Sequence, residues 1–293
     1  AGFPDHPHRG FITFTYMLDG HMEHRDSMGN RGDLRAGGAQ WMKAASGVIH
    51  SEMPQQTEGR MRGFQLWINL PAAEKMSDPA YQEFSAGTIP EAVGEGARVR
   101  VLAGEYGGRK GVISDPNTEV LYLDVALDGG VNFRFPVPAS HNAFVYVFEG
   151  DAETAGRALP RHSLAVLGEG DEVDLAAGPE GARFILVAGK PIGEPLVQYG
   201  PFVMNTRQEI EQAFADYQAG KLMRNLHGYV GQPVTRAALL LSALTFQRPG
   251  NIRAMEWAEI DEKAALWTIP SAKMKRTVEA KANGRNRAQS AAK

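Results

Sequence analysis

Apolar residues in the first two hundred positions come in short runs that are rich in β-branched and aromatic side chains. The run FITFTYML at 11–18 is followed by Asp19-Gly20, a dipeptide typical of a β-hairpin turn. Further strands are predicted at 21–27, 39–44, 47–53, 61–70, 97–103, 120–127, 131–136, 143–149, 162–168, 172–177 and 182–188. Turn residues recur about every eight to twelve positions, which is typical of antiparallel sandwiches and jelly rolls.

The predicted strands fall into two sets of similar size. A segment at 71–90 with three prolines separates them, and we expect it to be a loop-rich crossing. Within the first set, residues 29–33 are predicted to form a turn. The fold class is therefore mainly β, with two antiparallel β-barrel domains at 1–90 and 91–200.

A helix is predicted after the second set of strands. Thr206 and Glu209 have the spacing of a capping box, and apolar residues recur from Ile210 to Tyr217 at helical intervals. We expect this helix, within 201–223, to dock its apolar face on one of the barrels.

Composition narrows the classes of protein. The 293 residues are 43% hydrophobic and 22% charged, as in globular proteins, and contain no cysteine. Disulfides, thiolate metal sites and a cysteine nucleophile are excluded. The sequence holds no apolar run of membrane-spanning length and no signal peptide, so we expect a cytoplasmic protein. A start at Ala1, close to the first candidate ligand, predicts a truncated amino terminus that exposes a sheet edge.

The candidate chemistry lies in two short motifs, DHPHRG at 5–10 and IHSEMP at 49–54. In extended strands, alternate side chains share a face, so His6 projects with His8, and His50 projects with Glu52. If the two strands face each other, three imidazoles and a carboxylate surround one point. Such a mixed set suits iron, manganese, nickel, copper or zinc better than calcium.

The spacing alone leaves other ligand sets open. His21 and Glu23 have the same spacing as the second motif, and His24 is a third candidate beside them. His141 and His162 stand alone in the second set of strands, where we expect no metal site.

Several motifs together resemble the pirin family, a group of two-barrel cupin proteins. They are GFPDHPHRGF at 2–11, TYML at 15–18, QWM at 40–42 with GVIHSEMP at 47–54, QLWINLP at 65–71 and GPFVMN at 200–205. The resemblance covers about residues 1–223. It implies that His6, His8, His50 and Glu52 are iron ligands, and that His21 and Glu23 are ordinary strand residues.

The resemblance also implies an activity. Bacterial pirins are described as quercetin 2,3-dioxygenases, so we expect Fe(II)-dependent ring cleavage of a flavonol by O2 in a monomeric protein, with other divalent first-row metals as alternatives. Glu52 would then take the proton of the flavonol 3-hydroxyl group as a base. The alternative is a non-enzymatic, redox-responsive iron protein of the transcription-cofactor type, which acts by binding a partner.

The end of the chain differs from the rest. Residues 225–293 carry a net charge of +6 and the preceding residues −9, which indicates a separate segment at 224–293. Predicted helices at 235–246 and from 248, a strand at 264–270 and a basic hairpin at 273–276 resemble the start of a phage-type tyrosine recombinase, or integrase, over about 225–280.

That second resemblance implies no strand cleavage. Arg248 would be the first catalytic arginine and Lys275, or Lys273, the hairpin lysine, but no nucleophilic tyrosine follows and Tyr229 precedes them. We expect at most weak, nonspecific DNA binding by this basic tail, and disorder from Val278 onward. A further alternative is an inactive fusion product with a non-catalytic integrase fragment.

Overall fold

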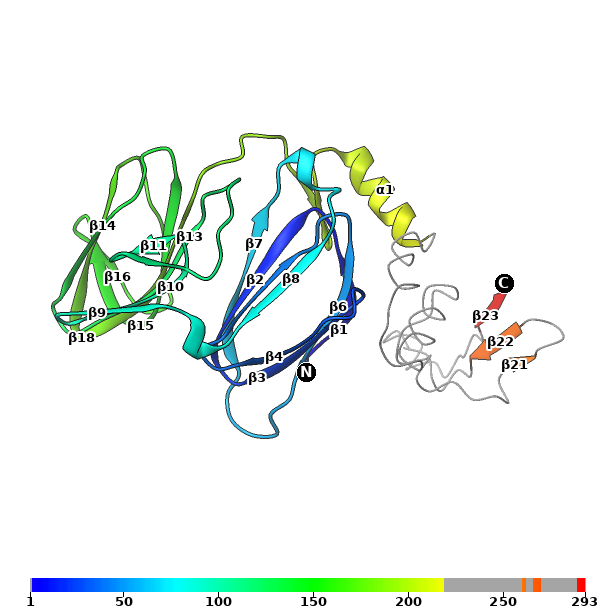
Figure 1. Ribbon diagram of the computed structural model, residues 1–293, viewed down its shortest axis with the longest axis horizontal. Coiled ribbons are helices and arrows are strands. Elements are labelled where there is room, and N and C mark those ends of the chain that lie inside the picture. Colours follow the sequence, from blue (N-terminus) through cyan, green and yellow to red (C-terminus); the bar gives the residue numbers. More distant parts are fainter. Residues whose placement is uncertain (1, 219–259, 262–265, 270–288, 293) are drawn as a thin grey trace, which may run out of the picture.

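Strand-forming runs of the sequence build two groups of antiparallel sheets that lie side by side in Figure 1. The computed structural model describes residues 2–218, 260–261, 266–269 and 289–292. The predicted fold class is confirmed: the protein is mainly β and adopts a bicupin fold, with one α-helix after the second group within these described residues.

The first group consists of two four-stranded sheets, ordered β1-β6-β3-β4 and β7-β2-β5-β8. Its strands are β1 (Phe3–His8), β2 (Phe11–Asp19), β3 (His21–Asp26), β4 (Arg31–Arg35), β5 (Ala39–Lys43), β6 (Val48–Pro54), β7 (Arg62–Asn69) and β8 (Ala80–Phe84). The short 3-10 helices η1 (Ala72–Glu74) and η2 (Ala86–Thr88) flank β8.

Two sequence predictions in this group are wrong. The segment 29–33 is not only a turn, because its second half opens β4, and the crossing segment 71–90 contains β8. Both are outermost strands of their sheets, and each carries few buried apolar side chains. A half-exposed strand has a weak apolar pattern, so neither was apparent from the sequence.

The second group centres on an eight-stranded sheet, ordered β16-β15-β18-β13-β10-β9, with β14 paired to β18 and β17 to β15. Its strands are β9 (Glu91–Gly94), β10 (Ala97–Ala103), β13 (Leu121–Leu127), β14 (Asn132–Pro136), β15 (Asn142–Thr154), β16 (Arg157–Leu159), β17 (Leu164–Val166) and β18 (Glu172–Gly189). A small hairpin joins β11 (Glu105–Tyr106) to β12 (Arg109–Lys110).

The long strand β18 replaces the two strands predicted at 172–177 and 182–188. Its first part pairs with β14 and its last part with β13, while Gly181 between them has a φ of 86°. The glycine-containing stretch therefore redirects the strand toward a second partner instead of ending it.

Strand β2 is buried on both faces, which explains its nearly continuous apolar sequence. Phe14 and Tyr16 point into a core shared with Tyr122 of β13. Thr15 lies on the opposite face, where its hydroxyl accepts a hydrogen bond from Gln65 at 3.0 Å. One face of β2 thus joins the two groups of sheets, and the other lines the interior of the first group.

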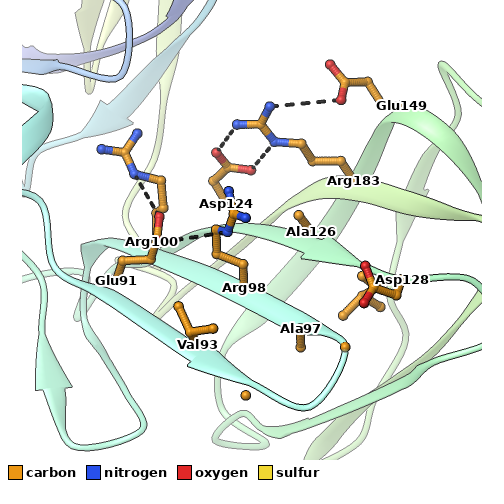
Figure 2. A pocket seen from close by; sticks show the side chains of 13 residues that line it. Glu91, Val93, Ala97, Arg98, Arg100, Asp124, Ala126, Asp128, Glu149 and Arg183 are labelled. Atoms are coloured by element: carbon orange, nitrogen blue, oxygen red, sulfur yellow. Dashed lines mark hydrogen bonds and ion pairs between the residues drawn. The ribbon is translucent and has the colours of Figure 1, made fainter.

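A polar network also crosses this junction. The Tyr16 hydroxyl donates to Asp124 at 2.6 Å, and Arg183 donates to the same carboxylate from two nitrogens, at 3.0 and 2.6 Å. Arg100 donates to the Tyr16 oxygen at 2.8 Å. Figure 2 shows the Asp124 and Arg183 pair and Arg100. These three residues line a pocket with a volume of about 410 Å³.

The predicted docking helix is present as α1 (Arg207–Gln218). Thr206 and Glu209 form the expected reciprocal cap, with Thr206 N donating to Glu209 Oε2 at 2.7 Å and Glu209 N to Thr206 Oγ1 at 3.2 Å. The helix packs on the short strands β19 (Val197–Tyr199) and β20 (Phe202–Met204), burying Ile210 among others.

Little of the tail is described. The predicted strand at 264–270 is present in its central part as β22 (Leu266–Ile269), which pairs with β21 (Ile260–Asp261) and β23 (Gln289–Ala292). The disorder expected from Val278 onward stays a prediction, because only Gln289–Ala292 of that segment lie within the described residues. The predicted helices and the basic hairpin lie outside the described residues. In the described part of the chain, the membrane-spanning criteria of length and hydropathy are met by no helix.

Candidate metal centre

Pairing of β1 with β6 brings the two histidine motifs together. His6 lies opposite His50 in this antiparallel register, with ring centroids 4.3 Å apart, and the His8 ring lies 4.7 Å from His6 and 4.9 Å from His50. One donor nitrogen of each ring lies within 4.8 Å of the others. The motifs were expected on strands that face each other, but they lie on neighbouring strands of one sheet.

Burial favours neutral rings at this cluster. His8 is 3% exposed and His50 is 1% exposed. Burial, followed by the charge of His6, lowers the pKa of His8 to about 4, against the opposite effect of its bond to the Pro201 carbonyl. Burial and the three neighbouring histidines also lower the pKa of His50 well below its ordinary value. Neutral imidazole is the form that binds a metal ion.

Backbone carbonyls determine which nitrogen of His6 and His8 carries the proton. His6 Nδ1 lies 2.9 Å from the Pro4 oxygen, and His8 Nδ1 lies 3.3 Å from the Pro201 oxygen. A carbonyl oxygen can only accept, so in the neutral rings both Nδ1 atoms donate and both Nε2 atoms keep a lone pair.

The two Nε2 atoms nevertheless lie 3.1 Å apart. Two lone pairs at this distance repel each other unless a cation lies between them. Two nitrogens bound side by side to one first-row ion at about 2.1 Å are separated by about 3.0 Å. The donor set therefore fits a metal ion, and the Nε2 atom of His50 is also buried and has no hydrogen-bond partner.

Glu52 lies two positions after His50 on β6 and is 3% exposed. Its carboxylate forms a donor group with His24 and His50, all within 4.8 Å of one another. Gln65 of β7 donates to both carboxylate oxygens, at 3.1 and 3.2 Å, so the opposite sheet holds this side chain in place.

The alternative ligand candidates His21, Glu23 and His24 lie on two different faces of β3. On β3, the alternation places Met22, His24 and Asp26 in the interior and His21 and Glu23 toward the surface. His21 contacts Asp33, and Glu23 pairs with Arg25 and Arg31. Neither belongs to a group of three metal donors within the described residues, whereas His24 does.

The two single histidines of the second group of sheets also belong to no such group in the part of the chain that the structure describes. His141 lies 3.6 Å from Glu119 through Nε2, and His162 lies near Tyr146 at the surface.

Three residues near the site were given no role from the sequence. Asp26 contacts His24, Gln65 contacts Glu52, and Trp67 places its ring 5.2 Å from His8. Asp26 stands two positions from His24, and Gln65 stands two positions from Trp67, so the period-two alternation could have placed each pair on one face of its strand. Nothing in that alternation indicates that β3 and β7 approach the histidine motifs.

Comparison with known proteins identifies the family. The sequence pattern of the family described as Pirin matches residues 1–68, and that of the Pirin C-terminal cupin domain matches residues 122–223. A pirin-like protein of Caulobacter vibrioides is 50% identical over 223 residues, which are 75% of this chain and 80% of the relative. The chain belongs to the pirin family.

Two further relatives of this pirin-family chain carry an enzyme name. A Pseudomonas aeruginosa protein, provisionally named quercetin 2,3-dioxygenase, is 48% identical over 231 residues, 76% of this chain and 80% of its own length. The crystal structure of a quercetin 2,3-dioxygenase from Acinetobacter baumannii superimposes with a TM-score of 0.72 at 37% identity, covering 75% of this chain and 79% of that one. The comparisons give no evidence for the integrase-like segment at 225–280.

Proposed function

We propose that His6, His8, His50 and Glu52 hold Fe(II), and that the protein cleaves the ring of a quercetin-like flavonol with O2. The convergence of three buried or half-buried histidines carries this proposal: the Nε2 atoms of His6 and His8 lie 3.1 Å apart, and that of His50 is buried without a hydrogen-bond partner. The enzyme name of the two relatives supports the reaction class.

Bound Fe(II) would supply redox chemistry for O2 and a positive charge that favours an ionised flavonol. The protein's own contribution begins with Glu52, which we propose takes the proton of the flavonol 3-hydroxyl group on a carboxylate oxygen. Gln65 lies within hydrogen-bond distance of both oxygens of Glu52 and of Thr15 Oγ1 at 3.0 Å. It thereby holds the base in one orientation while the proton moves.

Trp67 supports an aromatic substrate. Its side chain is 42% exposed, although its ring lies 4.2 Å from Phe11 and 5.2 Å from His8. An exposed indole beside the imidazole cluster offers a flat surface on which a flavonol ring can stack. Its Nε1 atom donates to Gln65 Oε1 at 3.3 Å, which links the stacking surface to the side chain that holds Glu52.

The proposal is tested by loading the purified protein with Fe(II) without air, measuring bound metal, and following quercetin loss together with O2 uptake. We expect one equivalent of iron and coupled consumption of both substrates. The variant His50→Ala should lose the metal and the turnover. The variant His162→Ala, an exposed histidine of the second group of sheets, should match the wild type. Iron binding without turnover would contradict the enzyme proposal and favour the non-enzymatic, redox-responsive alternative.

The role of Glu52 as a base needs a separate variant. Glu52→Gln keeps the size of the side chain but cannot take a proton, so we expect turnover to fall by roughly 100-fold or more at unchanged substrate saturation. Bound iron should be measured in the same preparation. A variant that retains iron and full turnover would eliminate Glu52 as the base.

A further inference from the structure

A buried pair behind the metal centre has no role in the function proposed above. His24 and Asp26 of β3 are 0% and 4% exposed, and His24 Nε2 lies 3.2 Å from Asp26 Oδ2. The other neighbours of this carboxylate are donors: the backbone N–H groups of Met28 and Asn30 and the side-chain amide of Asn30, at 2.9–3.0 Å. Asp26 therefore accepts every one of these bonds, and His24 Nε2 carries a proton.

The second nitrogen of His24 faces the metal centre. His24 Nδ1 lies 3.4 Å from His50 Nδ1. Because the proton of a neutral His24 ring is on Nε2, its Nδ1 can only accept, and His50 Nδ1 must donate. The remaining nitrogen of His50 is Nε2, which is buried and has no hydrogen-bond partner.

We propose that Asp26 and His24 are positioning residues that hold His50 in the tautomer with a free Nε2 lone pair. This inference rests on the proposed metal centre. His6 and His8 need no further residue to fix their tautomers, because backbone carbonyls accept from their Nδ1 atoms and a carbonyl oxygen cannot donate. His50 instead faces an imidazole, which could donate or accept, so a carboxylate is required to decide between the two.

Packing also fixes the orientation of the His24 ring. The His24 ring stacks on Tyr81 with centroids 4.7 Å apart and planes inclined by 19°. Tyr81 is itself held between Gln40, which donates to its hydroxyl at 2.8 Å, and Glu83, which accepts from it at 2.7 Å. Stacking on Tyr81 and the contacts of both ring nitrogens therefore hold the His24 ring in one orientation.

The first test needs neither a metal nor activity. Long-range ¹⁵N NMR spectra of the metal-free wild-type protein, with His50 assigned through His50→Gln, report which ring nitrogen carries the proton. We expect His50 with protonated Nδ1 and bare Nε2, and His24 with the opposite arrangement. Protonated Nε2 in neutral His50 would overturn the proposal.

The second test reverses the donor and acceptor roles of the His24 and His50 nitrogens. Asn at position 26 can keep its Oδ1 toward the two backbone N–H groups, which turns its NH2 group toward His24 Nε2. His24 would then accept at Nε2 and donate from Nδ1, and the proton of His50 would move to Nε2. We expect Asp26→Asn to weaken Co(II) binding roughly 10- to 100-fold, measured by competition with a chelating indicator.

Asp33→Asn is the matched control, because Asp33 contacts His21 at the surface of the same sheet. It should bind Co(II) like the wild type. His24→Phe preserves an aromatic ring on Tyr81 but removes the acceptor, and it should weaken binding to a similar extent as Asp26→Asn. Unchanged affinity in a folded Asp26→Asn protein would overturn the proposal, and so would complete loss of binding in His24→Phe, which would make His24 a ligand.

These outcomes separate the two proposals. Failure of wild-type protein to bind Co(II) would contradict the metal centre, whereas the NMR spectrum of the metal-free protein still decides the tautomer. Normal Co(II) binding without quercetin turnover would contradict the enzyme activity and leave the positioning role intact.

Discussion

Replacing Asp124 by asparagine tests the polar junction between the two groups of sheets. Asp124 is 2% exposed and accepts three hydrogen bonds, one from Tyr16 and two from Arg183. Burial opposes the charge on Arg183, but the bonds and the charge of Asp124 raise its pKa above the usual range. Burial and the same carboxylate raise the pKa of Tyr16. Asp124 therefore influences the pKa of both of its partners.

The magnitude follows from the bonds that asparagine cannot make. Its NH2 group is a donor, so at least one of the three donors around position 124 loses its acceptor whichever way the amide is turned. Hydrogen bonds to charged groups contribute about 1.5–3 kcal/mol each, and breaking a buried ion pair costs about 3–5 kcal/mol. The Arg183 side chain is 29% exposed, which lets water compensate in part. We expect the free energy of unfolding to fall by about 3 kcal/mol.

Urea unfolding followed by circular dichroism measures this loss. Asp174→Asn is the control, because Asp174 pairs with Arg134 at 2.9 Å on the same sheet but both side chains are at least half exposed. That variant should lose less than about 0.5 kcal/mol. A loss below about 1 kcal/mol for Asp124→Asn, or equal losses in the two variants, would refute the assignment of Asp124 as the stabilising centre of the junction.

Three further predictions concern the first group of sheets. Lys75 is 1% exposed and donates to two backbone carbonyls and one side-chain amide oxygen. Lys75→Met should therefore lower the free energy of unfolding by about 3 kcal/mol in urea titrations. An unchanged value would show that the three acceptors find other donors. Gly10 has a φ of 87°, and a Cβ there would clash with the Val203 carbonyl oxygen. Gly29 has a similar φ of 91°, but a Cβ there would meet no other atom. Gly10→Ala should therefore unfold at a much lower urea concentration than Gly29→Ala, and equal midpoints would contradict the clash. Trp67→Ala should raise the KM for quercetin roughly 5- to 10-fold with bound iron unchanged, and an unaltered KM would remove the stacking role.

The β architecture could be read from the sequence where burial is strong. Strand β2 is buried at every position except Asp19, because one face joins the second group of sheets and the other lines the interior, and its run of apolar and β-branched residues was therefore clear in the sequence. Strand β4 has a single large apolar residue, Leu34, and β8 lies at a sheet edge. Edge strands have fewer buried neighbours, so their residue types carry less information about their conformation.

The candidate ligands could be found because their spacing is local. His6 with His8, and His50 with Glu52, each show the alternation of a strand within three residues. The positioning pair has the same spacing on β3, but its meaning depends on the register that sets Asp26 opposite His50 and His24 opposite Glu52. Register between strands about 25 residues apart is a tertiary property, and residue types within one strand do not specify it.

The tautomers at the candidate metal centre depend on partners that residue types cannot reveal. His8 donates to the carbonyl oxygen of Pro201, which is 193 positions away, and any residue at that position would supply the same acceptor. The Arg9 backbone N–H donates to the same carbonyl at 3.4 Å, and its carbonyl accepts from Val203 at 3.0 Å, so β20 is bound directly beside the histidine motif. Arg9 also reaches α1 through Asp216 at 3.0 Å. The segment after the second group of sheets thus orients a histidine of the first, and the candidate metal centre and the docking of α1 are parts of one structure.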